Sequence, residues 1–133
     1  MNERRRITNP WTWQDQFGFV QANTVAAQRL VFCSGQASID ADGTPVHGGD
    51  LSAQLTQALD NLETVLKDAG VGLSDVVRLD YYTTDVDGLL ASWEIITARL
   101  AEANCRPAST LLGVSRLAFP ELLVEIAATA AAT

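Results

Sequence analysis

The spacing of hydrophobic residues along the chain predicts two amphipathic helices. Leucines recur every three or four positions from residue 51 to residue 66, with polar side chains on the opposite side. Asp50 is suited to begin this helix and Gly70 to end it. A second helix is predicted from about residue 88 to residue 104, with an apolar stripe of Leu89, Trp93, Ile96 and Leu100. Each helix has one apolar face and must therefore pack against another element.

Short runs rich in β-branched and aromatic residues predict five strands. They cover residues 17–21, 29–34, 75–84, 110–117 and 122–130. A strand, a helix and a further strand in succession favour parallel pairing, and the strand pairs at the two ends favour antiparallel hairpins. The sequence therefore predicts an α+β fold with one mixed sheet of five to six strands and two helices packed on one face.

The predicted strands carry apolar residues on both sides. In the last strand Val124, Ile126 and Ala128 point one way, whereas Glu125 and Ala127 point the other way. Two helices cover only one face of such a sheet. We therefore expect the second face to pack against another copy of the chain.

Glu125 is the exception among acidic residues that otherwise follow helix surfaces and turns. It lies in the middle of an apolar run, so its carboxylate must either be hydrogen-bonded or line a polar cavity. One interpretation is a structural pair with Arg78 or Arg116. The other is that Glu125 orients a water molecule or a substrate group in a cleft between subunits.

Composition narrows the class of protein. The chain has 133 residues, 47% of them hydrophobic, which is enough for one domain with a real core. Its formal charge of −7 argues against nucleic acid as a partner, because binding it depends on cations that neutralise phosphates. No apolar run is long enough to cross a membrane, and no apolar segment follows the arginines at residues 4–6 as in an export signal. We expect a soluble, cytoplasmic protein with Cys33 and Cys105 reduced.

Most catalytic signatures are absent from the sequence. There is no glycine-rich phosphate loop, no nucleophile elbow and no zinc-binding helix motif. His47 is the only histidine and lies in a turn-rich link, where nothing nearby would orient it as a catalytic base. One histidine and two scattered cysteines do not supply a zinc site, so neither a metal nor a cofactor is expected.

Five segments, in their order and spacing, resemble those of the RidA/YjgF reactive-intermediate deaminase family, also called the L-PSP endoribonuclease family. They read Phe17-Gly18-Phe19-Val20-Gln21-Ala22, Val31-Phe32-Cys33-Ser34-Gly35-Gln36, Gln57-Ala58-Leu59-Asp60-Asn61-Leu62, Arg106-Pro107-Ala108-Ser109-Thr110-Leu111-Leu112-Gly113-Val114 and Pro120-Glu121-Leu122-Leu123-Val124-Glu125-Ile126. The resemblance begins at about residue 15. It divides the chain into an amino-terminal extension, residues 1–14, and a single RidA/YjgF-like domain, residues 15–133.

This resemblance implies a chorismate-mutase-like fold assembled as a homotrimer, with ligand clefts between subunits. Well-studied members hydrolyse enamines and imines of 2-amino acids to 2-oxo acids and ammonia, without metal or cofactor. Their chemistry is modest, because an imine already reacts with water and needs only positioning and charge stabilisation. The glutamate that these members use to handle water matches Glu125.

The sequence also departs from the family pattern. Active members have an arginine that grips the substrate carboxylate, and Ser109 occupies that position. Arg106 is a poor substitute, because an offset of three residues in a strand points to the opposite face. A tyrosine that the family often keeps is Phe19 here. We expect Ser109, Thr110, Ser34 and Phe19 to shape the cleft.

Three functions follow from these observations. The leading hypothesis is a trimeric deaminase or related hydrolase of a small imine, enamine or carbonyl compound, with a substrate preference altered by Ser109. The alternative is a non-catalytic trimer that binds a metabolite or a partner protein. An endoribonuclease is less favoured, because the body of the chain is acidic. Trp11 and Trp13 either cover the mouth of the cleft or, as we prefer, pack ordinarily at the amino terminus.

Overall fold

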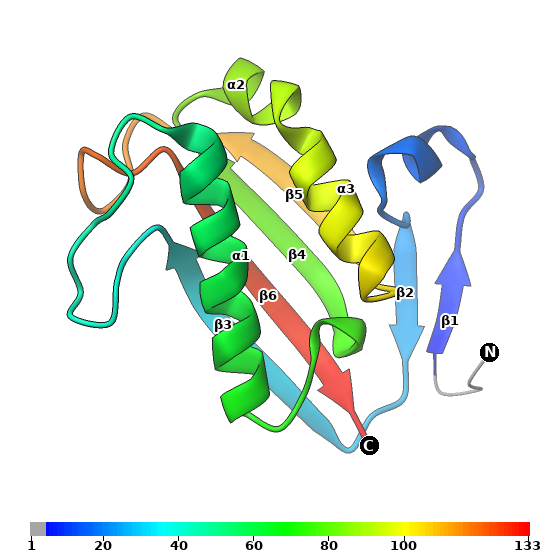
Figure 1. Ribbon diagram of the computed structural model, residues 1–133. Helices are drawn as coiled ribbons and strands as arrows, with labels where there is room; N and C mark the ends of the chain where they lie inside the picture. The colour runs from blue at the N-terminus through cyan, green and yellow to red at the C-terminus, as the bar shows by residue number, and fades with distance from the viewer. Residues whose placement is uncertain (1–4) are drawn as a thin grey trace.

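The computed structural model describes residues 5–133 and shows a mixed sheet with its helices on one face (Figure 1). The main sheet has the strand order β3-β6-β4-β5. These strands are β3 (Arg29–Ala37), β6 (Val124–Ala132), β4 (Val76–Thr83) and β5 (Ala108–Gly113). A separate antiparallel pair joins β1 (Arg5–Thr8) to β2 (Ala22–Val25).

The helices are close to those that the sequence predicts. They are α1 (Leu51–Asp68), α2 (Val86–Ala91) and α3 (Trp93–Glu102), with short 3-10 turns η1 (Trp13–Phe17) and η2 (Leu73–Asp75). Asp50 begins α1, since its carboxylate accepts a hydrogen bond from the Ala53 amide at 3.1 Å. The leucine stripe of α1 and the even-numbered residues of β6 are buried in the core. The predicted fold class is therefore confirmed.

The strand pairing differs from the prediction at both ends of the chain. The predicted hairpin of the first two strands is wrong, because β3 pairs with β6 and no strand forms at residues 17–21. The prediction of a hairpin between the last two strands is wrong, because β6 lies between β3 and β4 and is antiparallel to both. β5 is instead parallel to β4, as expected for a strand, helix and strand in succession. β5 and β6 thus lie on either side of β4 (Figure 1).

Several predicted elements differ from those in the structure. The predicted strand at residues 17–21 is wrong, because η1 ends there and Gly18, at a φ of 80°, turns the chain in a left-handed conformation. The predicted single helix over residues 88–104 is two helices, because α2 ends and α3 starts at Ser92. The strand predicted at 110–117 ends at Gly113, and no strand was predicted at Arg5–Thr8.

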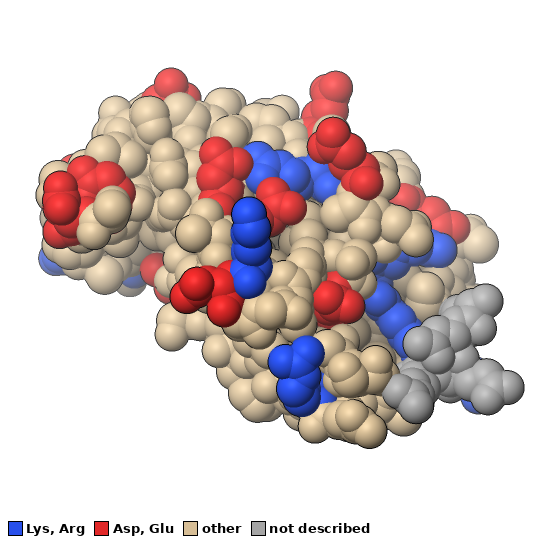
Figure 2. Space-filling model, turned by 60° about the horizontal axis from the view of Figure 1, so that its bottom comes forward, with Lys and Arg blue, Asp and Glu red and all other residues tan. Residues whose placement is uncertain are grey.

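Charged side chains are mixed on the molecular surface. On the face that Figure 2 presents, acidic groups lie between the basic ones, so no continuous basic surface forms there. Arg99 of α3, for example, bridges to Asp60 and Glu63 of α1 at 2.7 and 2.6 Å. Among residues 5–133, no helix combines the length and the apolar character needed to cross a membrane.

The two cysteines are buried and make the protein sensitive to alkali. Burial raises the pKa of the Cys105 thiol to about 12 and also raises the pKa of Cys33. An unfolded thiol ionises near pH ~8.5, so above that pH the unfolded chain releases protons that the native chain keeps. The free energy of unfolding should therefore fall as the pH rises from about 9 toward 12.

Urea unfolding of the wild type and of a Cys105→Ala variant between pH 8 and pH 10.5 checks this prediction. The decline with pH should be shallower in the variant, which has lost one of the shifted thiols. Parallel pH profiles of the two proteins would show that Cys105 has no part in the alkaline sensitivity.

Candidate functional site

Glu125 lies in β6 on the sheet face that the helices leave open. Its neighbours Val124 and Ile126 point into the core, and Glu125 itself is half-buried on the other side. Its carboxylate lies against Gly35 of β3, where an added Cβ would overlap Oε2 of Glu125. The β3–β6 register also shifts between Cys33 and Gln36. The irregular strand and its glycine together make room for the carboxylate.

Two hydroxyl-bearing residues lie on the strands on either side of Glu125. Tyr82 is its direct cross-strand partner in β4, and Ser34 lies exposed in the irregular part of β3. Cross-strand partners on one face of a sheet are close enough for their side chains to interact. Sequence reasoning missed Tyr82 as a site residue, because the pairing of β4 with β6 depends on strand order rather than on any local pattern.

The predicted structural pairing of Glu125 with an arginine of its own chain is wrong. Arg78 instead pairs with Asp80 at 3.0 Å and donates to Oγ1 of Thr110 at 2.8 Å. Arg116 donates to backbone carbonyls of its own loop. Within residues 5–133, the carboxylate of Glu125 makes no hydrogen bond or ion pair, although its backbone belongs to the β3–β6–β4 ladder. Its carboxylate is therefore available to a ligand or to a neighbouring subunit.

Thr110 shares the open face with Glu125 but lies two strands away. It pairs across β5 and β4 with Asp80. Oδ1 of Asp80 is buried without a hydrogen bond of acceptable geometry, although Nη2 of Arg78 lies 3.0 Å from it. The ion pair therefore compensates the charge of Asp80, and Thr110 completes a small polar cluster with these two residues.

Ser109 points to the opposite sheet face from Glu125, and Phe19 lies beside the outer strand β5. Ser109 pairs with Leu79, a fully buried core residue, so the Ser109 side chain points to the helix-bearing face. Phe19 lies beside the β5 edge, because the next residue, Val20, donates its amide to the Pro107 carbonyl at 2.9 Å. One chain therefore does not bring Ser109 and Phe19 together with Glu125, and a site containing all three needs a second copy.

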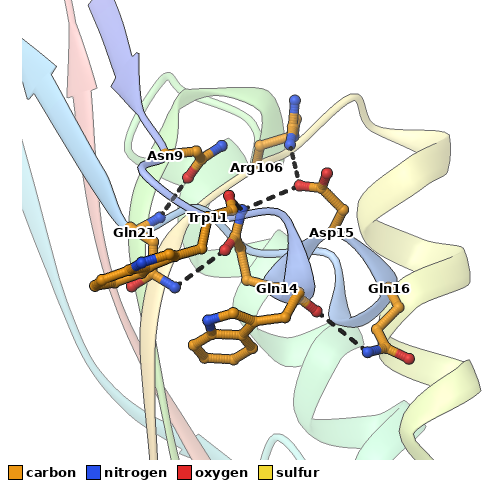
Figure 3. Close-up of polar contacts among 8 residues, drawn as sticks. Asn9, Trp11, Gln14, Asp15, Gln16, Gln21 and Arg106 are labelled. Atoms are coloured by element: carbon orange, nitrogen blue, oxygen red, sulfur yellow. Dashed lines mark hydrogen bonds and ion pairs between the residues drawn. The ribbon is translucent and has the colours of Figure 1, made fainter.

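Arg106 forms an ion pair with Asp15 of η1. Its Nη2 lies 3.3 Å from Oδ1 of Asp15, and Figure 3 shows the two side chains meeting at η1. Within one chain Trp11 is 57% exposed and Trp13 is 54% exposed, and the expected packing is seen only in the edge-to-face contact of Trp13 with Phe19.

Comparison with known proteins decides the family. The sequence profile of the family described as Endoribonuclease L-PSP matches residues 15–132. The chain belongs to the L-PSP family. The resemblance to RidA and YjgF proteins seen in the sequence is thereby confirmed.

Other L-PSP and Rid proteins share both the sequence and the fold. A RutC family protein of Pyrococcus horikoshii is 30% identical, over 82% of this chain and 84% of its own length. The crystal structure of YyfB from Yersinia pestis, a protein of unknown function of the conserved Rid family, is 39% identical. It superposes with a TM-score of 0.87 and covers 96% of this chain and 98% of its own. The YjgF gene product of E. coli is 28% identical, with a TM-score of 0.68 over 85% of this chain and 87% of its own.

Proposed function

We propose that this L-PSP family chain is a deaminase or related hydrolase of a small imine, enamine or carbonyl compound, acting in clefts between the subunits of a homotrimer. The observation that carries the proposal is the half-buried, unpaired carboxylate of Glu125 over Gly35 on the open sheet face. A carboxylate in such a place must find a polar partner, and a water molecule beside a bound imine meets that need.

The open face has the properties of a subunit interface. Phe32 of β3 is 76% exposed on it, and Leu112 of β5 is 50% exposed on it. Large apolar side chains that are exposed on one sheet face favour association of that face with another copy of the chain. A cyclic arrangement would place the β5 edge of one subunit, with Ser109 and Phe19, against the Glu125 face of the next subunit.

Hydrolysis of an imine needs only a positioned water molecule and a group that accepts its proton. Glu125 accepts a proton from the attacking water as the water oxygen bonds to the imine carbon, which gives a carbinolamine. Glu125 then returns this proton to the nitrogen, the C–N bond breaks with loss of the hydroxyl proton, and ammonia leaves with a carbonyl compound as the second product. The hydroxyls of Ser34 and Tyr82, on the strands on either side of Glu125, supply neutral hydrogen bonds to the reacting group. No redox step is involved, and the protons and electrons balance within the hydrolysis.

A ribonuclease role is disfavoured by the charges, although the family description names one. Arg78, Arg99 and Arg106 are each paired with carboxylates, so they are not free to neutralise phosphates. The formal charge of −7 repels a polyanion as well.

Ser109 should set the preference against carboxylate-bearing substrates. A charge-assisted hydrogen bond to a carboxylate contributes about 1.5–3 kcal/mol, or roughly 10-fold to 150-fold in rate. The Ser109→Arg variant should therefore hydrolyse 2-iminopropionate, generated in situ, faster than the wild type by about that factor. The decay of the imine is followed against a protein-free blank.

This role for Ser109 would be contradicted if the wild type hydrolysed 2-iminopropionate as fast as a relative that carries the arginine. A failure of both proteins to accelerate any imine, while a metabolite still raises Tm, would instead favour a non-catalytic binding protein. RNA cleavage that survives in Glu125→Ala would separate any nuclease activity from this cleft.

A further inference from the structure

Two exposed tryptophans stand on the amino-terminal segment beside the β5 edge. Trp11 is 57% exposed and Trp13 is 54% exposed. The Trp13 ring meets the Phe19 ring edge to face, with centroids 5.7 Å apart and an interplanar angle of 72°. Trp13 therefore extends the surface that begins at Phe19, a residue of the proposed cleft.

A buried polar network holds this segment in place. Gln14 is fully buried, and its Nε2 donates to the Trp11 carbonyl at 2.8 Å and to Oδ1 of Asp15 at 3.2 Å. Its Oε1 accepts a hydrogen bond from Nε2 of Gln21 at 3.1 Å, and Oδ1 of Asn9 accepts one from the backbone amide of Gln21 at 2.8 Å. Figure 3 shows these contacts linking the two arms of the segment. Nε2 of Gln16 donates to the Trp13 carbonyl at 3.2 Å, so the backbone under both indoles is held in place before any ligand binds.

The segment lies next to the position where the family arginine is missing. Val20 forms an isolated parallel bridge with Ala108, and Ser109 is the following residue. The charge of Arg106, which lies close by in the sequence, is compensated by Asp15. At this end of the proposed cleft, aromatic side chains therefore lie beside Ser109, the position at which active family members carry the arginine that binds the substrate carboxylate.

We infer that the edge-to-face pair of Trp13 and Phe19, with the exposed Trp11 on the same segment, forms an aromatic wall that selects imines and carbonyl compounds with an aromatic or extended apolar substituent in place of a carboxylate. The inference rests on the proposed function, because it assigns the substrate class of the same cleft. Indole faces bind planar apolar groups at low entropic cost when they are already held in position. Hydrolysis of such an imine takes up one water and releases ammonia and the corresponding aldehyde or ketone.

Calorimetric titration with stable neutral carbonyl probes tests the wall independently of turnover. Phenylacetamide should bind the wild type about tenfold more tightly than acetamide, and this ratio should fall close to one when Trp11 and Trp13 are both changed to Ala. These substitutions leave the carbonyl of residue 11 in place for Gln14. Leu90→Ala, at a 51% exposed apolar residue of α2, is the matched control and should keep the ratio.

The outcomes separate the wall from the proposed function. An unchanged ratio in the double variant overturns the wall, and so does a change in oligomeric mass, which would show that the indoles cover a subunit contact. Tight phenylacetamide binding without hydrolysis of any imine would uphold the wall and overturn the deaminase proposal. Imine hydrolysis together with equal affinity for phenylacetamide and acetamide would support the deaminase proposal and overturn the aromatic wall.

Discussion

Replacing Glu125 with Gln should slow imine hydrolysis by about 100-fold or more, because an amide does not accept the proton of the attacking water. The change keeps the size of the side chain, and Gly35 still leaves room for it. Phenylacetamide binding and Tm should therefore change little. Steady-state hydrolysis of a neutral imine, measured together with thermal unfolding, checks this expectation.

Glu94→Gln is the control for this prediction. Glu94 is an exposed residue in the first turn of α3, far in the fold from the open sheet face. Its loss should leave the rate at the wild-type level. Equal activity of the Glu125→Gln and Glu94→Gln proteins would remove Glu125 from the mechanism and leave only a binding role for the cleft.

Gly35→Ala should reduce hydrolysis by about 10-fold to 100-fold without unfolding the protein. The new methyl group would occupy the space of the Glu125 carboxylate, which must then rotate away. Because the displaced group is the end of a flexible side chain, the free energy of unfolding should change by less than about 1 kcal/mol. This result would identify Gly35 as a positioning residue that acts through Glu125.

A pH profile and a glycine control identify this positioning role. The profile of kcat should shift in Gly35→Ala, since the carboxylate moves to a new environment, whereas a merely structural effect would lower the rate equally at all pH values. Gly48→Ala is the matched control, because its Cβ would meet only an ordinary contact with Glu121. A Gly35→Ala rate equal to that of Gly48→Ala would rule out the proposed role.

The sequence predicts the elements of this fold better than their pairing. The leucine stripe of α1 and the alternation in β6 follow from burial of one face, which leaves a periodic mark on the sequence. The position of β6 between β3 and β4 leaves no such mark, because it depends on which edges meet once the helices have packed. The predicted hairpin of the last two strands failed for this reason.

The candidate site is predictable to the same extent. Alternation alone places Glu125 opposite the core, and the structure agrees. The roles of Gly35 and Tyr82 depend on the register of β6 with its two neighbours, so no local pattern predicts them. The same register shows that Ser109 and Glu125 point to opposite faces of the sheet. A site that contains both residues therefore requires two subunits.

Mixing of inactive subunits tests this requirement most directly. Glu125→Gln blocks one half of the proposed cleft, and Ser109→Trp fills the other half. Oligomers reassembled from equal amounts of the two variants should regain activity at about one quarter of their sites, each made from Glu125 of one protomer and Ser109 of the next. Mixed oligomers of the expected mass that stay as inactive as their parents would contradict a cleft shared between subunits.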